Sequence, residues 1–165
     1  MKRSKEVQAQ EKELALRNFK FNRFLFIRYA LAFSAIANLY WLFMNLFTQI
    51  SSVVVPLMMV ILGGMAAFEY IKVYWVHENK LKYSKIYFQA QFIMNIGLFL
   101  LSLNDSVFAF LYPFMEVTPE ARMLVYGILA IGMVIAGVSL FKIHRIHLNK
   151  DKKYQYIQRY EKYSS

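Results

Sequence analysis

The sequence predicts an all-α fold, a polytopic membrane protein with four transmembrane helices. Hydrophobic residues make up 58% of the 165-residue chain and aromatic residues 18%, which is more apolar than soluble domains of this size. A soluble helix bundle would show polar stripes at helical period, whereas 53–68 and 123–141 contain no charged residue. Four apolar runs are each long enough to cross about 30 Å of hydrocarbon as a helix. They cover residues 24–49, 53–76, 86–112 and 121–143.

The basic residues indicate how the chain is threaded through the membrane. Every Lys and Arg except Arg122 lies in one of three clusters, at 1–28, 72–85 and 142–162. Short basic segments stay in the cytoplasm, so an even number of crossings must separate successive clusters. Four helices satisfy this condition and place both termini inside. We therefore expect one domain, 1–165, with basic cytoplasmic helical extensions at both ends, over 1–23 and 144–165.

The first membrane helix, 24–49, carries two amides at membrane depth. Asn38 and Asn45 are seven residues apart and share a helical face. A buried amide needs a hydrogen-bonding partner, so this face is expected to look into the bundle.

The second helix, 53–76, combines small residues with one carboxylate. Gly63 and Gly64 would let a neighbouring backbone approach closely. Glu69 lies about one turn inside the cytoplasmic end. It either pairs with Lys72 or Arg28 and staples the helix ends together, or it binds a proton or cation in a transport cycle.

The third helix contains Asn95 and covers either 86–103 or 86–112. The sequence Asn104-Asp105-Ser106 interrupts the longer run. We expect the membrane helix to end near Leu103. Asp105 or Ser106 would then cap a short outer helix over 107–114. Asp105 is also placed to pair with Arg122, with a water-exposed cap as the alternative.

The fourth helix, 121–143, has a recognisable start and a small-residue face. Thr118-Pro119-Glu120 has the pattern of an N-cap, a proline in the first turn and an acidic residue there. Gly132 and Ala136 form a small-xxx-small pair, which predicts close helix packing.

A weak internal repeat is visible at an offset of 57 residues, and chance similarity is its rival explanation. Asn38 then matches Asn95, and Pro56 matches Pro113. Because the helices that hold Asn38 and Asn95 both run outward, this pattern predicts two helical hairpins in parallel topology.

Polar and ionisable residues at or near membrane depth are the candidate functional residues. They are Arg28, Asn38, Asn45, Glu69, Lys72, Asn95, Asn104, Asp105 and Arg122. His77, His144 and His147 are weak metal candidates, because a zinc site needs three or four placed ligands and these histidines have basic neighbours. We expect no metal site and no cofactor. The chain has no cysteine, no HExxH, no GxSxG and no glycine-rich phosphate loop, so we expect no enzyme.

These observations predict a non-enzymatic membrane protein that acts by association. It would be an accessory or regulatory subunit of a membrane complex, or a small membrane-resident immunity or stress factor. The expected partners are anionic lipids on the cytoplasmic side and a protein partner or further copies of the chain, but no nucleic acid. The expected location is the plasma membrane, or the endoplasmic reticulum membrane in a eukaryote. The alternative is a small homo-oligomeric transporter or channel with a path lined by Asn and Glu.

Overall fold

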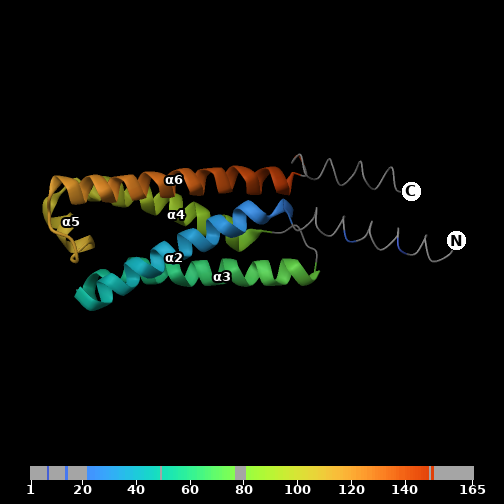
Figure 1. Cartoon of the computed structure of the whole chain (residues 1–165), viewed down its shortest axis with the longest axis horizontal. Helices are drawn as coiled ribbons and strands as arrows, with labels where there is room; N and C mark the ends of the chain where they lie inside the picture. The colour runs from blue at the N-terminus through green and yellow to red at the C-terminus, as the bar shows by residue number, and fades with distance from the viewer. Residues whose placement is uncertain are drawn as a thin grey trace.

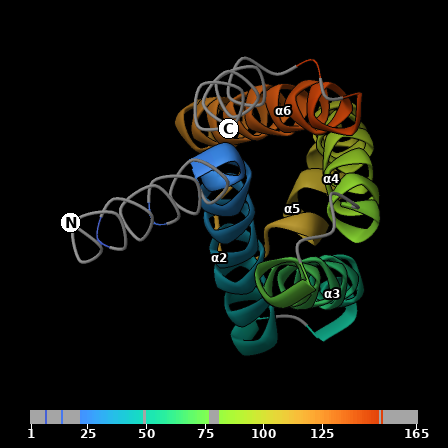
Figure 2. The same ribbon diagram turned by 90° about the vertical axis from the view of Figure 1, so that its right-hand side faces the viewer.

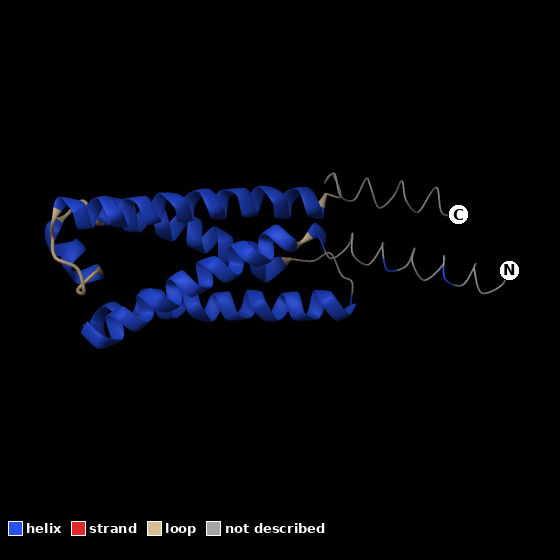
Figure 3. Ribbon diagram, in the orientation of Figure 1, coloured by secondary structure: helices blue, strands red, loops and turns tan. Residues whose placement is uncertain are grey.

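The computed structural model describes residues 7, 14, 22–48, 50–76, 81–148 and 150, and within these ranges the regular structure is entirely helical (Figure 3). The all-α fold class is therefore confirmed for this part of the chain. The elements are α2 (Leu25–Thr48), the short 3-10 helix η1 (Ile50–Ser52), α3 (Val54–Val76), α4 (Lys82–Leu101), α5 (Asp105–Leu111) and α6 (Pro119–His147). Most of the predicted terminal extensions, and His77, lie outside the described residues.

The four long helices form a bundle in which each helix has two main neighbours. Going around the bundle, α2 packs on α3, α3 on α4, α4 on α6, and α6 on α2 (Figure 2). The start of α2, the end of α3, the start of α4 and the end of α6 share one end of the bundle, called here the basic end. Helix α5 lies across the opposite end, called the α5 end (Figure 1).

Among the described residues, three helices are long and apolar enough to cross a membrane. These segments are Leu25–Thr48, Val54–Lys72 and Pro119–His147. Helix α4 has 20 residues but is less apolar, because it contains two lysines near its start and the amides Gln89, Gln91 and Asn95. The membrane prediction is thus supported by three spans.

The start of α6 follows the predicted local pattern. The Thr118 side chain accepts a hydrogen bond from the Ala121 N–H at 3.2 Å, Pro119 opens the helix and Glu120 lies in its first turn. The N-cap satisfies one of the free N–H groups of the first turn.

The region around the third predicted helix requires two corrections. Helix α4 ends at Leu101, so an unbroken helix over 86–112 is wrong, and the helix begins at Lys82 rather than at residue 86. The short helix α5 does follow, but its cap is Asn104, whose side chain accepts from the Val107 N–H at 3.2 Å. Neither Asp105 nor Ser106 is the cap, because both already belong to the helix.

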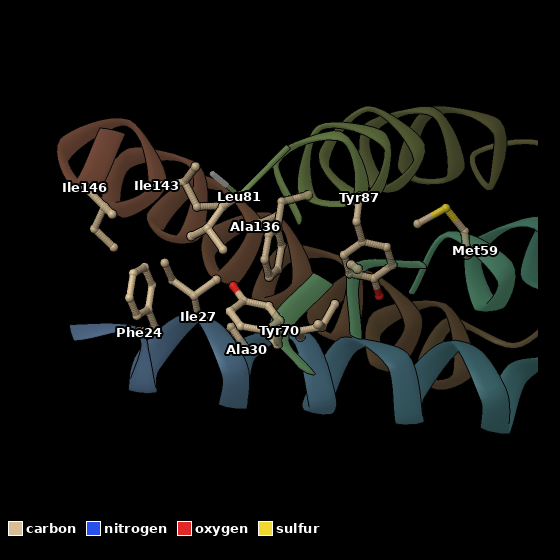
Figure 4. Packing of buried hydrophobic residues seen from close by; sticks show 13 residues of the cluster. Phe24, Ile27, Ala30, Met59, Tyr70, Leu81, Tyr87, Ala136, Ile143 and Ile146 are labelled. Atoms are coloured by element: carbon tan, nitrogen blue, oxygen red, sulfur yellow. The ribbon is translucent and has the colours of Figure 1, made fainter. Parts of the chain in front are cut away.

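The apolar core lies between the helices along most of the bundle. Toward the basic end, Phe24, which precedes α2, and Ile27 of α2 meet Ile143 and Ile146 of α6 (Figure 4). A second apolar cluster, which includes Phe108 of α5, fills the α5 end. The side chains that face outward are also largely apolar, as expected for helices surrounded by lipid.

The helix order bears on the proposed repeat. The two hairpins, α2–α3 and α4–α6, occupy opposite halves of the bundle, with α2 diagonal to α4 (Figure 2). A two-fold rotation along the bundle would exchange them. The repeat itself stays a prediction.

Candidate functional site

A chain of buried amides connects α2 to α4 inside the bundle. Asn38 of α2 is buried, and its Nδ2 donates to Oε1 of Gln91 at 2.8 Å and to the hydroxyl of Tyr87 at 3.2 Å. The same Nδ2 lies 2.9 Å from the Ser34 carbonyl one turn earlier. Gln91 Nε2 in turn donates to Oδ1 of Asn95 at 3.0 Å. We call Asn38, Tyr87, Gln91 and Asn95 the amide network.

Two glycines leave room for this network. A Cβ built at Gly132 of α6 would collide with Nδ2 of Asn95, so a larger residue there would force that amide to move. A Cβ at Gly63 of α3 would lie 3.4 Å from the Tyr87 ring and 3.6 Å from Ala35. All four long helices thus touch the network or its immediate surroundings.

The amide network has the chemistry of an interhelical clamp. It contains no charged group, and its hydrogen bonds join side chains of α2 and α4 inside the bundle. Interhelical hydrogen bonds of this kind stabilise membrane bundles by about 0.6 kcal/mol on average and up to about 2 kcal/mol. Because amides bond only at defined positions, the network also sets the rotation of α2 relative to α4.

Glu69 forms a second buried polar contact at the basic end. Its carboxylate accepts hydrogen bonds from the Tyr83 N–H at 2.9 Å, the Ser84 N–H at 2.8 Å and the Ser84 hydroxyl at 2.8 Å. These two N–H groups belong to the first turn of α4, whose own N-cap, Leu81, has no side chain able to accept them. Glu69 therefore caps α4 from the neighbouring helix α3.

This arrangement corrects the expected partner of Glu69. Neither Lys72 nor Arg28 donates any of these three hydrogen bonds. Lys72 is exposed, and the Arg28 guanidinium lies 6.0 Å from the centre of the Tyr70 ring. Glu69 still ties two helices together at the basic end, but it does so through the backbone of α4. A carboxylate beside a helix N-terminus is also favoured by the helix dipole.

A basic side chain makes the complementary contact at the end of α6. Arg23 is buried, and one of its terminal nitrogens donates to the carbonyl of Ile146 at 3.1 Å. That carbonyl lies in the last turn of α6, where backbone acceptors have no helical partner. An acid thus caps a helix start and a base caps a helix end, both from neighbouring segments.

The α5 end is held by contacts between loops and helices. Asn45 Nδ2 donates to the Ser52 carbonyl at 3.4 Å, and Trp41 Nε1 donates to the Leu111 carbonyl at 3.2 Å. The predicted pair of Asp105 with Arg122 is present as an ion pair, with the carboxylate largely exposed. The Trp41 hydrogen bond and the ion pair dock α5 onto the bundle, whereas the Asn45 hydrogen bond joins α2 to η1.

The remaining candidate residues occupy less distinctive positions. Ala136 is buried in the core. At Gly64 the expected close approach of a neighbouring backbone is wrong, because a Cβ built there would meet no atom within 4 Å among the described residues. His144 and His147 are exposed on α6. Among the described residues, no group of three metal-ligating side chains comes together.

Sequence reasoning missed several residues that the structure brings into these contacts. Gln91 lies at the centre of the amide network, and Ser84 and Arg23 complete the contacts at the basic end. Gln91 could have been found, since it lies four residues before Asn95 in an otherwise apolar run. Ser84 and Arg23 carried no comparable signal.

Comparison of the chain with protein-family models, with curated proteins and with solved structures gives no match.

Proposed function

We propose that this chain is an integral membrane protein with four crossing helices that works by association, as an accessory or regulatory subunit of a membrane complex, rather than as an enzyme or a transporter. One observation carries the proposal. Buried Asn38 of α2 donates a hydrogen bond to Gln91 of α4, and Gln91 donates one to Asn95. A transport path would instead need such amides free to exchange partners with water or substrate.

The burial pattern of α4 supports its role as the fourth crossing. At about 1.5 Å per residue its 20 residues reach about 30 Å, the thickness of the hydrocarbon layer. Its polar residues Ser84, Gln91 and Asn95 are buried among the other helices. Its outward side chains beyond the first two turns include Ile93 and Leu100, which suit lipid. A helix can therefore cross with a modest overall hydropathy when its polar face is covered.

The charge distribution supports placing the basic end in the cytoplasm. The described basic residues at that end are Arg23, Arg28, Lys72, Lys82, Lys85, Lys142, Arg145 and Lys150, against Arg122 alone toward the α5 end. Anionic lipids of the inner leaflet attract such residues at about 1 kcal/mol each. Both termini would then face the cytoplasm.

Two measurements made on the same tagged protein test the proposal. The first is affinity purification from native membranes in mild detergent, followed by quantification of co-purifying chains. We expect a stoichiometric partner, either another protein or a second copy. Recovery of a bare monomer would count against association.

The second measurement is proton and cation flux in liposomes under an imposed gradient. We expect no flux above that of empty liposomes. Asn38→Leu removes the α2 side of the amide network, and Ile36→Leu, on the outward face of the same helix, is its matched control. Flux in the native protein and in Ile36→Leu that is lost in Asn38→Leu would establish the transporter instead.

A further inference from the structure

One side of α4 changes from basic to apolar along the helix. Several of its exposed side chains recur at every third or fourth position and therefore share this side. In order from the basic end, they are Lys82, Lys85, Gln89, Ile93, Ile96 and Leu100. Ammonium groups, an amide and apolar side chains thus follow one another from the basic end inward.

Gln89 places an exposed amide where the two helices beside α4 expose apolar groups. It lies one turn after Lys85, the last basic residue of α4. At the same distance from the basic residues of α3 and α6, the exposed side chains are Phe68 and Val138. The Gln89 side chain makes no hydrogen bond with another described residue. An amide without a partner is unfavourable beside lipid chains, and this one leans toward the start of the helix, where the headgroups begin.

The packing of α4 on α6 fixes which of their residues lie level. A Cβ at Gly137 of α6 would lie 3.7 Å from the Phe92 ring of α4. The two helices are antiparallel neighbours (Figure 1, Figure 2), so two turns toward the basic end bring Lys85 level with His144. Both side chains are exposed, one on each side of the boundary between α4 and α6. A cation and an imidazole therefore lie one turn closer to the basic end than the Gln89 amide.

We propose that the boundary between α4 and α6 at the basic end binds one anionic phospholipid of the cytoplasmic leaflet. The lipid phosphate lies at Lys85 and His144, because an ammonium and an imidazole N–H both donate to phosphate oxygens. The Gln89 amide donates to an ester carbonyl of the same lipid, and an acyl chain lies along Ile93. This inference rests on the membrane insertion and the orientation proposed above, and it replaces a general attraction to anionic lipid with one defined site.

The order of these groups fits a phospholipid better than an acidic segment of a protein. A phospholipid carries an anion, then hydrogen-bond acceptors, then hydrocarbon along the membrane normal, which matches Lys85, Gln89 and Ile93 in turn. A peptide could supply a carboxylate to Lys85. At the depth of Gln89, however, its backbone would need every polar group satisfied internally.

Lipid titration of the full chain tests the site. The chain is purified in mild detergent, stripped of lipid and titrated with phosphatidylglycerol or with phosphatidylcholine, and bound lipid is measured by native mass spectrometry. We expect one phosphatidylglycerol to bind more tightly than phosphatidylcholine, and Lys85→Gln to raise its Kd about fivefold. The matched control is Lys142→Gln, which removes the same charge at the same end. Its ammonium lies on the α2 side of α6, 4.6 Å from the centre of the Phe26 ring, so the Kd should stay unchanged.

Gln89→Leu tests the contact with the ester carbonyl. It keeps the side chain close in size and removes the donor, and should raise the Kd for phosphatidylglycerol about threefold. A diether analogue of the same lipid has no ester carbonyl, so Gln89→Leu should leave its Kd unchanged. Ile93→Leu, one turn deeper on the same side of α4, is the control and should change neither value.

Equal affinity for the two lipids, or equal losses from Lys85→Gln and Lys142→Gln, would show diffuse attraction of charge and overturn the inference. The same effect of Gln89→Leu on ester and diether lipid overturns it too, as does displacement of the lipid by soluble glycerol phosphate. A selective lipid site in a chain that co-purifies with no partner upholds this inference and refutes association. A stoichiometric partner together with no lipid selectivity refutes this inference and upholds association.

Discussion

Replacing Glu69 by Gln distinguishes two roles for this residue, a cap on the start of α4 and an ion-pair partner of a basic side chain. The Glu69 carboxylate accepts three hydrogen bonds, from Tyr83 N–H, Ser84 N–H and the Ser84 hydroxyl. Glutamine keeps the length of the side chain but has one acceptor oxygen, and its NH₂ group would face donors. Hydrogen bonds to a charged group are worth about 1.5–3 kcal/mol each. Because the backbone donors of α4 lose a charged acceptor and one of them loses its partner, we expect Glu69→Gln to cost about 2–4 kcal/mol of unfolding free energy.

The assay is reversible unfolding in mixed micelles, followed by the loss of helical circular dichroism. Lys72→Gln is the control, since Lys72 is exposed and lies on the same helix three residues later; it should change stability by less than about 0.5 kcal/mol. A double-mutant cycle with Ser84→Ala should give a coupling energy of about 0.5–2 kcal/mol. Coupling of Glu69 to Lys72 but not to Ser84, or a negligible cost of Glu69→Gln, would refute the capping role.

Three further predictions follow from the same contacts. Gly132→Ala should lower the unfolding free energy by about 1–3 kcal/mol in the same assay, because the new Cβ displaces the buried Asn95 amide. Its control is Gly127→Ala, at an open helical position, which should be neutral or raise the unfolding free energy by up to about 1 kcal/mol. Arg23→Gln should lower the unfolding free energy by about 1–2 kcal/mol through loss of the cap on the last turn of α6, and an unchanged value would contradict that contact. An impermeant thiol reagent should label Glu116→Cys but not Lys82→Cys in intact cells, and the reverse pattern would invert the proposed topology.

The starts of α5 and α6 show which features of the fold the local sequence predicts. Thr118 and Pro119 mark the start of α6 because N-capping involves residues three apart in the chain. The break before α5 was visible in Asn104-Asp105-Ser106 for the same reason, although the capping residue was assigned one or two positions too late. Signals of this kind depend on neighbours in sequence and need no knowledge of packing.

The hydrogen-bond partners that side chains find on other helices were harder to predict from the sequence. Asn38 and Asn45 were expected to face the bundle interior, and both are buried there. That Gln91 joins Asn38 to Asn95 depends on the place of α2 and α4 in the bundle and on the rotation of each helix. Glu69 gives a second example, because Lys72 and Arg28 were assigned to it from their distance in sequence and their expected depth in the membrane. The first turn of α4 lies nearest in space.

The sequence by itself determined the helical class, the apolar runs and the asymmetric distribution of Lys and Arg, because hydrophobicity and charge are summed along the chain. Only the tertiary structure decided that α4 hides its amides, that Gly132 makes room for Asn95, and that Glu69 caps a neighbouring helix. These contacts depend on the rotation of each helix about its own axis and on the order of helices around the bundle. A rotation of one residue, about 100°, changes every partner while leaving composition, length and hydropathy the same.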